Sequence, residues 1–351
     1  MKFAWNRGTL LSLDSKHNQL WEKWFYLIDK GSYNNGDPFP LVNLSEQPNK
    51  EVYKQLENTF HSVSHLGISL HDFVDWICYA IGISWCSEKP RVTEKAHTLL
   101  KEQFPWEGII SHPADYFSYF LAANGSSGVL EYYPTPSALS RLLTTMVEPS
   151  LGESVIEPCI GAGGIILTTN TLNMVGMDLN LLMVKASCIQ AFFYKPQLLY
   201  SPRPLTNVHL TCNGQVERYF EFDTDTRIYR GDSLLGEFVA PKHIFREGSE
   251  LVDIYVNPKR ERNRSTHHVR SLMSTEWTKL SYNDRLQAVK AFARERPFEY
   301  ILTNPPFSMK LGSEYKRIIE EIEKDNVIFL AEINAEPVTT NQLEPHQLLL
   351  F

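Results

Sequence analysis

The chain has 351 residues, of which 43% are hydrophobic and 21% charged, so it is long enough for one large globular domain or two. A formal net charge of −7 excludes a general electrostatic attraction to nucleic acid, and a polyanion would have to meet a local basic patch. The first residues carry no secretory signal, no apolar run reaches membrane length, and the five cysteines form no C-x-x-C pair. We therefore expect a soluble, cytoplasmic protein without a membrane segment, a metal site or disulfides.

Residues 1–125 are predicted to form a helical N-terminal domain. Ser69 followed by Asp72 forms a capping box for a helix that would bury Phe73 and Trp76. Aromatic residues at helical spacing are more typical of a helical core than of a surface that stacks on bases. The clearest stripe of this kind consists of Leu20, Trp21, Trp24, Phe25 and Ile28.

A linker rich in glycine and serine, residues 124–128, leads into a second predicted domain that spans residues 126–351. Residues 132–136 then read Tyr-Tyr-Pro-Thr-Pro, and the leucines after them suit an amphipathic helix over Ser137–Val147. Thr135 lies just before this helix, where unpaired N–H groups and the helix dipole favour an anion such as a carboxylate.

A short predicted strand, Ser154–Glu157, leads into the glycine-rich turn of residues 158–164 and a helix that begins near Ile165. Glycines let the backbone pass close to a ligand and leave N–H groups pointing inward. The next predicted strand, residues 174–177, ends in Asp178, where an acidic side chain is placed to bind ribose hydroxyls. Two alternatives stay open: a purely structural glycine turn, and Asp178 as the N-cap of the following helix.

Asn213 and Gly214 lie between alternating residues and predict a β-hairpin before a third strand at residues 227–230. That strand ends in Gly231 and Asp232, the third acidic turn in sequence order. A long charged insertion, about residues 236–297, follows. It contains a basic stretch that we expect to contact DNA phosphates, with a solvated loop as the alternative. The basic residues are Lys259, Arg260, Arg262, Arg264 and Arg270.

Residues 300–307, Tyr-Ile-Leu-Thr-Asn-Pro-Pro-Phe, predict a buried strand that stops abruptly at Asn304. The stiff turn after the strand offers an amide side chain, carbonyls whose direction the two prolines fix, and an aromatic ring. Such a set suits a flat heterocycle with an exocyclic amine. The alternative is a structural proline turn capped by a core Phe307. A charged helix at residues 314–324 and one more strand at residues 327–330 are predicted after it.

In this order, the motifs around Thr135, the glycine turn, Asp178, Asp232 and Asn304 resemble those of S-adenosylmethionine-dependent DNA adenine-N6 methyltransferases. The likeness covers about residues 110–330, and it is greatest to the modification subunits of type I restriction systems. It implies an α/β fold with a Rossmann-like methyltransferase sheet behind an α-helical N-terminal domain. It also implies S-adenosyl-L-methionine as the cofactor and DNA as a partner.

The resemblance assigns roles to individual residues. The first set would bind the cofactor: Tyr133, Thr135, Gly161 and Gly163 at the methionine end, Glu157 as the residue that orders the turn, Asp178 at the ribose, and Leu179 and Asp232 at the adenine. The second set, Asn304, Pro305, Pro306 and Phe307, would form the catalytic turn that binds a flipped target adenine. Few residues follow this turn, so the fold is trimmed, borrows strands from the insertion, or is completed by a specificity subunit or a second protomer. A catalytically incomplete subunit, or a methyltransferase acting on RNA or a protein glutamine, are the alternative functions.

Overall fold

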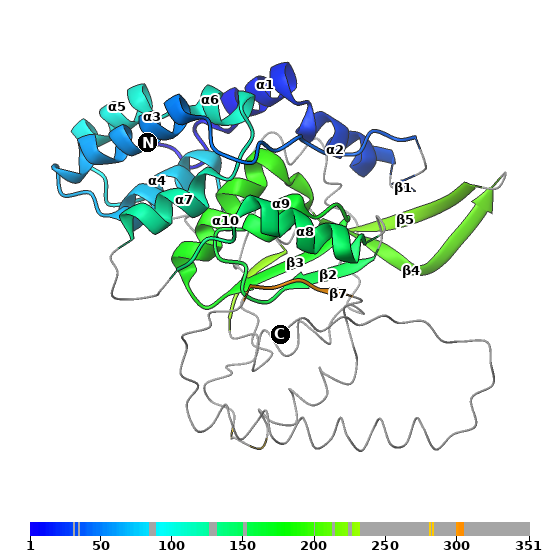
Figure 1. Cartoon of the computed structure of the whole chain (residues 1–351). Coiled ribbons are helices and arrows are strands. Elements are labelled where there is room, and N and C mark those ends of the chain that lie inside the picture. The colour runs from blue at the N-terminus through cyan, green and yellow to red at the C-terminus, as the bar shows by residue number, and fades with distance from the viewer. Residues whose placement is uncertain are drawn as a thin grey trace.

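The computed structural model describes residues 1–30, 32–33, 36–83, 89–125, 132–149, 153–199, 201–212, 215–223, 227–231, 281, 283 and 300–304, and every structural feature below belongs to them (Figure 1). These residues form an α/β structure of helices and a small parallel sheet. Before residue 125 the helices are α1 Arg7–His17, α2 Leu20–Lys30, α3 Lys50–Ser64, α4 Leu70–Ile81, α5 Glu94–Gln103, α6 Trp106–Ser111 and α7 Tyr116–Asn124. Within the described residues, no helix combines the length and apolar character that a membrane crossing needs.

Helix α4 begins at the predicted capping box. The Ser69 hydroxyl accepts a hydrogen bond from the backbone N–H of Asp72 at 3.1 Å, and the Asp72 carboxylate accepts one from the backbone N–H of Ser69 at 3.2 Å. The helix ends at Gly82 in the left-handed conformation, which a glycine adopts without steric cost. Phe73 and Trp76 are buried, so the prediction that this aromatic face is core is confirmed.

A four-stranded parallel sheet has the order β6-β3-β2-β7. Its strands are β2 Ser154–Glu157, β3 Asn173–Asp178, β6 Ile228–Arg230 and β7 Tyr300–Ile301, and these confirm the four strands predicted at these places. The prediction that the strand before Asn304 is buried is wrong for Ile301, which is 54% exposed, whereas Leu302 is buried. Chain order runs outward from β2 on both sides, to β3 and β6 on one and to β7 on the other. The sheet therefore has a topological switch point between β2 and β7, where ligands bind in open α/β sheets.

Three helices and a short turn accompany the sheet: α8 Ser137–Val147, α9 Gly164–Thr168, α10 Leu181–Tyr194 and the 3-10 turn η2 Pro196–Leu198. A separate antiparallel sheet has the order β1-β5-β4, with β1 Ser32–Tyr33, β4 Ser201–Cys212 and β5 Gln215–Asp223. Because Cys212 pairs with Gln215, only two residues join β4 to β5, and the predicted hairpin is confirmed. The connecting residues 213–214 lie outside the described part of the chain, as do the helix and strand predicted after residue 313.

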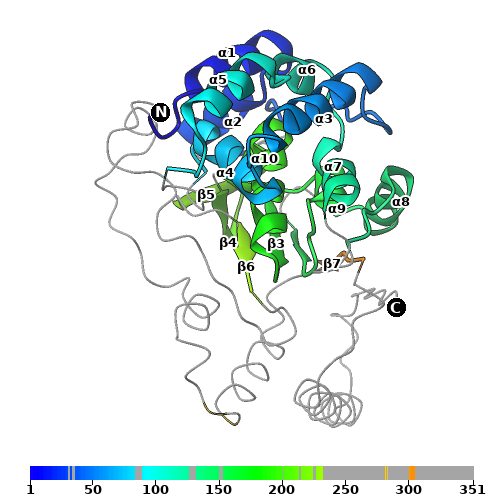
Figure 2. The ribbon, with the colours of Figure 1, turned by 90° about the vertical axis from the view of Figure 1, so that its left-hand side faces the viewer.

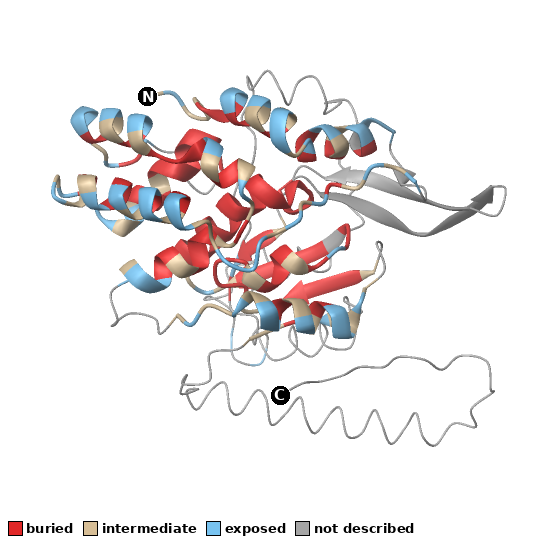
Figure 3. Ribbon diagram, turned by 45° about the horizontal axis from the view of Figure 1, so that its top comes forward, coloured by how far each residue is buried: buried red, intermediate tan, exposed pale blue. Residues whose placement is uncertain are grey.

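Helix α10 lies between the sheet and the N-terminal helices (Figure 2) and is buried along nearly its whole length. The Trp21 indole N–H donates to the carbonyl of Phe192 at 2.9 Å, and the Lys185 ammonium pairs with Asp75 of α4 at 2.6 Å. In Figure 3 buried surfaces face inward, whereas the outer faces of the N-terminal helices are exposed. One hydrophobic core thus joins the N-terminal helices to the parallel sheet.

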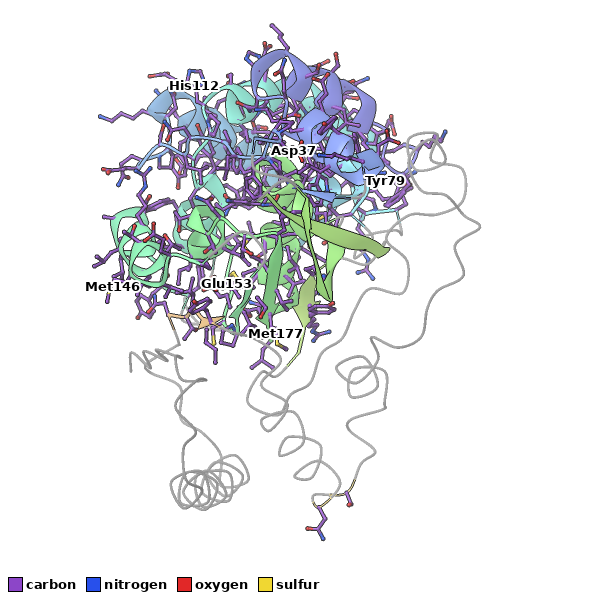
Figure 4. All side chains as sticks on the ribbon, turned by 90° about the vertical axis from the view of Figure 1, so that its right-hand side faces the viewer. Asp37, Tyr79, His112, Met146, Glu153 and Met177 are labelled. Carbon is purple, nitrogen blue, oxygen red and sulfur yellow. The ribbon has the colours of Figure 1, made fainter. Side chains whose placement is uncertain are left out.

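Helix α8 was predicted over the residues where it occurs, but only part of its apolar side faces the core, through Leu143 and Val147. It packs on α9, and its buried residues are Ser140 and Thr144, whose small side chains let a helix approach its neighbours closely. Other large side chains of the helix are solvent-exposed, Leu142 by 55% and Met146 by 48%, and Met146 lies at the outer surface in Figure 4. The expectation that the leucines form the buried face of this helix is wrong for Leu139 and Leu142.

A buried lysine follows α10. The Lys195 ammonium donates to the carbonyl of Thr169 at 2.7 Å and to the Asn170 side-chain oxygen at 3.2 Å. Both acceptors are neutral, and burial lowers the pKa of Lys195 to about 7. A positive charge on this group therefore destabilises the folded protein.

Candidate active site

Two acidic side chains meet at the carboxyl ends of neighbouring strands. Glu157 ends β2 and Asp178 ends β3, and these strands are parallel with Glu157 opposite Gly176. In Figure 4, Met177, the residue before Asp178, lies at the edge of the described body that faces away from His112 and the N-terminal helices. The carboxyl ends of the strands therefore face away from the helical layer.

Burial raises the pKa of Glu157 well above its ordinary value, and the nearby charge of Asp178 raises it further. The Ile166 backbone N–H donates to the Glu157 carboxyl group and partly opposes this rise. Glu157 is only 2% exposed, and its Oε2 has no hydrogen-bond partner among the described residues. Glu157 thus lies under the start of α9 and holds one unsatisfied oxygen, which is costly in a buried position.

Asp178 joins the glycine turn to the start of α10. Its Oδ2 accepts from the Gly161 backbone N–H at 2.9 Å, and its Oδ1 accepts from the Asn180 backbone N–H at 2.8 Å. Burial raises its pKa, while these two hydrogen bonds favour its charged form. The N-cap of α10 is Asn180, whose side chain accepts from the Leu182 N–H at 2.9 Å. The alternative that Asp178 is the helix N-cap is therefore wrong.

The N–H groups of the glycine turn are bonded within the protein. Ile160 donates to the Met177 carbonyl at 2.7 Å and Gly163 donates to the Ile160 carbonyl at 2.8 Å. Gly161 donates to Asp178, and Ala162 donates to the Tyr132 hydroxyl at 3.2 Å. These four N–H groups thus already have acceptors within the protein.

Tyr132 is a residue of this site that the sequence did not single out. Its ring covers Gly161, where an added Cβ would lie 2.6 Å from Tyr132 Cε2, and Gly161 has a φ of +54°. Glycine is thus needed at 161 for its backbone conformation and for the tyrosine ring above it. The neighbouring Tyr133, which was predicted to bind the cofactor, is 71% exposed. The only available signal was the pair of adjacent tyrosines, which does not say which one turns inward.

The side chains of Thr135 and Asn304 are in contact, although they are far apart in sequence. Asn304 Nδ2 donates to Thr135 Oγ1 at 3.1 Å. β7 brings Asn304 to this place through the Leu302 N–H, which donates to the Ile156 carbonyl at 3.0 Å. The amide nitrogen of Asn304 therefore faces Thr135, which leaves the amide oxygen as the side that can accept from a ligand.

An apolar side chain, Leu179, and a basic side chain, Arg230, lie near Asp178 at the carboxyl ends of the strands. Leu179 is 45% exposed, and Arg230 Nε donates to the Leu179 carbonyl at 3.3 Å. Gly231 donates to the Asp178 carbonyl at 3.0 Å, so the third strand end lies beside the second, as predicted. The remaining predicted site residues lie outside the described part of the chain: Asp232, Pro305, Pro306, Phe307, Lys259, Arg260, Arg262, Arg264 and Arg270.

Three polar side chains behind the turn were also missed. Ser187 donates to the Gly161 carbonyl at 2.6 Å, and Gln190 donates to the Ala162 carbonyl at 2.7 Å and to Asp115 at 2.8 Å. They come from α10 and the start of α7, and no local pattern in the sequence connects them. Within the described residues, no group of three or more His, Cys, Asp or Glu side chains could hold a metal ion.

Residues 113–180 match a protein-family model described as N-6 DNA methylase. No curated protein and no solved structure matches the chain. The matched segment contains Asp115, Thr135, β2, the glycine turn and Asp178, and it ends before β6 and β7. The match supports the resemblance to DNA methyltransferases for this segment, whereas the likeness to type I restriction subunits rests on the motifs alone.

Proposed function

We propose that the protein transfers a methyl group from S-adenosyl-L-methionine to the N6 amine of adenine in DNA. The observation that carries this proposal is the hydrogen bond between Asn304 and Thr135. This hydrogen bond joins the first residue of the Asn-Pro-Pro-Phe motif to the segment that matches the N-6 DNA methylase family. The motif that would bind the target base thus lies beside the motifs that would bind the cofactor. The strand order around the switch point supports a Rossmann-like methyltransferase sheet, and α1–α7 support a helical N-terminal domain.

The residues at the strand ends fit the cofactor. Asp178 supplies a carboxylate that can accept from ribose hydroxyls, and the exposed side chain of Leu179 can pack against an adenine ring. Thr135 precedes α8, whose first N–H groups favour the carboxylate of an amino-acid end. Glu157 keeps an unsatisfied buried oxygen beside the glycine turn. The bound cofactor supplies an electrophilic methyl group on a sulfonium sulfur.

The turn after β7 would bind the target base. The Asn304 amide oxygen and the Pro305 carbonyl would each accept a hydrogen bond from one N–H group of the target amine. These two hydrogen bonds would direct the lone pair of the amine nitrogen at the methyl carbon. With its lone pair freed in this way, the amine nitrogen would be the nucleophile for the methyl group that the cofactor would supply, and it would afterwards lose a proton. Phe307 would stack on the base. Positioning and preorganised dipoles then account for catalysis without a covalent enzyme intermediate.

Contact with DNA would come from the basic stretch in the insertion, since the net charge of the chain is negative. Neutralising Arg260, Arg262 and Arg264 together should weaken binding to all DNA sequences and flatten its salt dependence by about one unit of slope per lost phosphate contact. Affinity for the cofactor should not change. As in type I restriction systems, a specificity subunit or a second protomer would supply sequence recognition.

The decisive experiment is transfer of labelled methyl groups to unmethylated genomic DNA, followed by digestion and nucleoside analysis. We expect N6-methyl-2′-deoxyadenosine in the digested DNA with the wild-type protein and none with Asn304→Ala. Cofactor binding without transfer would favour a subunit that needs a partner. Transfer to ribosomes or to release factors, but not to DNA, would assign the protein to another substrate class. Absence of heat and of a melting shift with either the cofactor or its demethylated product would refute the proposal.

A further inference from the structure

Gln190 is a buried amide on an otherwise mostly apolar helix. It lies in α10 with no exposed surface. A buried amide without partners destabilises a protein by about 1–3 kcal/mol, so its contacts are informative. Its side-chain Nε2 donates one hydrogen bond to the carbonyl of Ala162 in the glycine turn at 2.7 Å and one to Asp115 Oδ1 at 2.8 Å. Its oxygen accepts from the Phe117 N–H at 3.5 Å.

Asp115 connects this amide to the N-terminal helices. It is the N-cap of α7, where its Oδ1 also accepts from the Ser118 N–H at 3.0 Å. Its other oxygen lies against the glycine turn, since a Cβ added to Gly164 would be 3.1 Å from Asp115 Oδ2. Asp115 therefore contacts the turn at Gly164 and, through Gln190, at Ala162.

The turn needs such support because its glycines do not fix its shape. Gly161 and Gly163 both have positive φ angles, +54° and +100°, in a segment where glycine permits many conformations. A fully bonded buried network specifies one arrangement, whereas a partly bonded one leaves several. Gln190 bonds the Ala162 carbonyl of the turn, whereas Asp178 bonds the Gly161 N–H.

We propose that Gln190 and Asp115 are positioning residues that set the shape of the glycine turn, so that helix α7 of the N-terminal region controls affinity for the nucleoside cofactor. The effect on cofactor affinity rests on the proposed function, whereas the effect on the shape of the glycine turn does not. Neither residue needs to contact the ligand. The N-terminal helices would then act on cofactor binding through this one pair of side chains, in addition to their part in the shared core.

The first test measures the turn itself in the ligand-free protein. Gln190→Leu keeps the size of the side chain and removes its hydrogen bonds. Hydrogen exchange at the N–H groups of Gly161, Ala162 and Gly163 should become at least tenfold faster in this variant. Lys185→Met is the matched control, because it removes a different polar link between α10 and the N-terminal helices, the ion pair with Asp75. It should lower the melting temperature and leave exchange in the turn unchanged. Equal acceleration in both variants would overturn the inference, whether or not the protein binds the cofactor.

The second test measures affinity by calorimetry with S-adenosylhomocysteine. Gln190→Leu should weaken binding at least tenfold and Lys185→Met by less than twofold. In Gln190→Glu a second carboxyl group faces Asp115, so affinity should fall as pH rises and the shared proton is lost. The other titratable groups that interact with Asp115 are Tyr132 and Tyr194, whose pKa values burial raises, so they stay protonated. A wild-type protein that binds no cofactor refutes the proposed function. A Gln190→Leu variant with wild-type affinity refutes this inference alone.

Discussion

The two carboxyl groups at the ends of β2 and β3 should not carry the same charge at neutral pH. Glu157 is 2% exposed and has an unsatisfied oxygen, whereas Asp178 accepts two backbone hydrogen bonds that favour its ionised form. Burial and the charge of Asp178 together raise the pKa of Glu157. We therefore predict that Glu157 holds the proton and Asp178 the negative charge. The test compares Glu157→Gln, which imitates a protonated glutamic acid, with Asp178→Asn, which removes the charge.

The expected magnitudes follow from these contacts. A hydrogen bond to a charged group contributes about 1.5–3 kcal/mol, so Asp178→Asn should weaken cofactor binding by about 10- to 160-fold. Glu157→Gln should change the dissociation constant by no more than about threefold, because it alters no charge. Calorimetric titration with S-adenosylhomocysteine at pH 7 measures both values.

Stability against pH gives an independent readout. A carboxyl group whose pKa is raised on folding binds more protons in the folded state, so the free energy of unfolding falls as pH rises above its ordinary pKa of 4.5. Glu157 should contribute up to about 1.4 kcal/mol per pH unit to this fall, so the fall should be smaller in Glu157→Gln. Urea unfolding between pH 5 and 7, below the range in which Lys195 loses its proton, measures the difference between the two proteins. Equal losses of affinity in Glu157→Gln and Asp178→Asn, with no change of slope, would refute the assignment of the proton.

Three further predictions concern single side chains. Thr135→Val should lower kcat at saturating cofactor while Thr135→Ser keeps it, because the hydroxyl fixes the orientation of the Asn304 amide; a change in KM alone, seen in methyl-transfer kinetics, would contradict this. Gly161→Ala should lower the free energy of unfolding by about 2 kcal/mol or more in urea denaturation, since it combines a positive φ with a clash against Tyr132. The pKa of Lys195 is lowered to about 7, so its folded state binds fewer protons than the unfolded chain and stability should rise with pH between about 7 and 10.5. Lys195→Met should remove this rise of up to about 1.4 kcal/mol per pH unit, and an equal rise in the variant would assign it to other groups.

Local signals predicted much of the fold. The strand Ser154–Glu157 and the helix Ser137–Val147 occur with the expected bounds, and the capping box at Ser69 is formed. Each of these features depends on residues that are close together in the sequence, so a local sequence pattern is enough to predict it. The meeting of Asp178 and Gly231 at one edge of the sheet also followed, because the carboxyl ends of parallel strands lie at the same edge.

Other parts of the site depend on distant contacts. Gln190 and Asp115 are 75 residues apart, and neither belongs to a local pattern that marks it as polar and buried. In a non-helical segment, neighbouring residues face opposite sides, so the sequence alone does not decide whether Tyr132 or Tyr133 turns toward the glycine turn. The outward leucines of α8 depend on the small residues that pack against α9, which a periodic pattern of hydrophobicity does not reveal.

The position of β7 has a consequence for the order in which the protein folds. It pairs with β2 through Val155 with Tyr300 and Ile156 with Ile301, whereas β2 and β3 are neighbours in sequence. Closing a loop of about 145 residues costs about 1.8 kcal/mol more entropy than closing one of about 19 residues. β7 pairs with β2 through only two residue pairs, which do little to offset this entropy. We therefore expect β7 to join the sheet last and to open first. The chain thus assembles its glycine turn before Asn304 reaches Thr135, and the half that would bind the cofactor forms ahead of the half that would hold the target base.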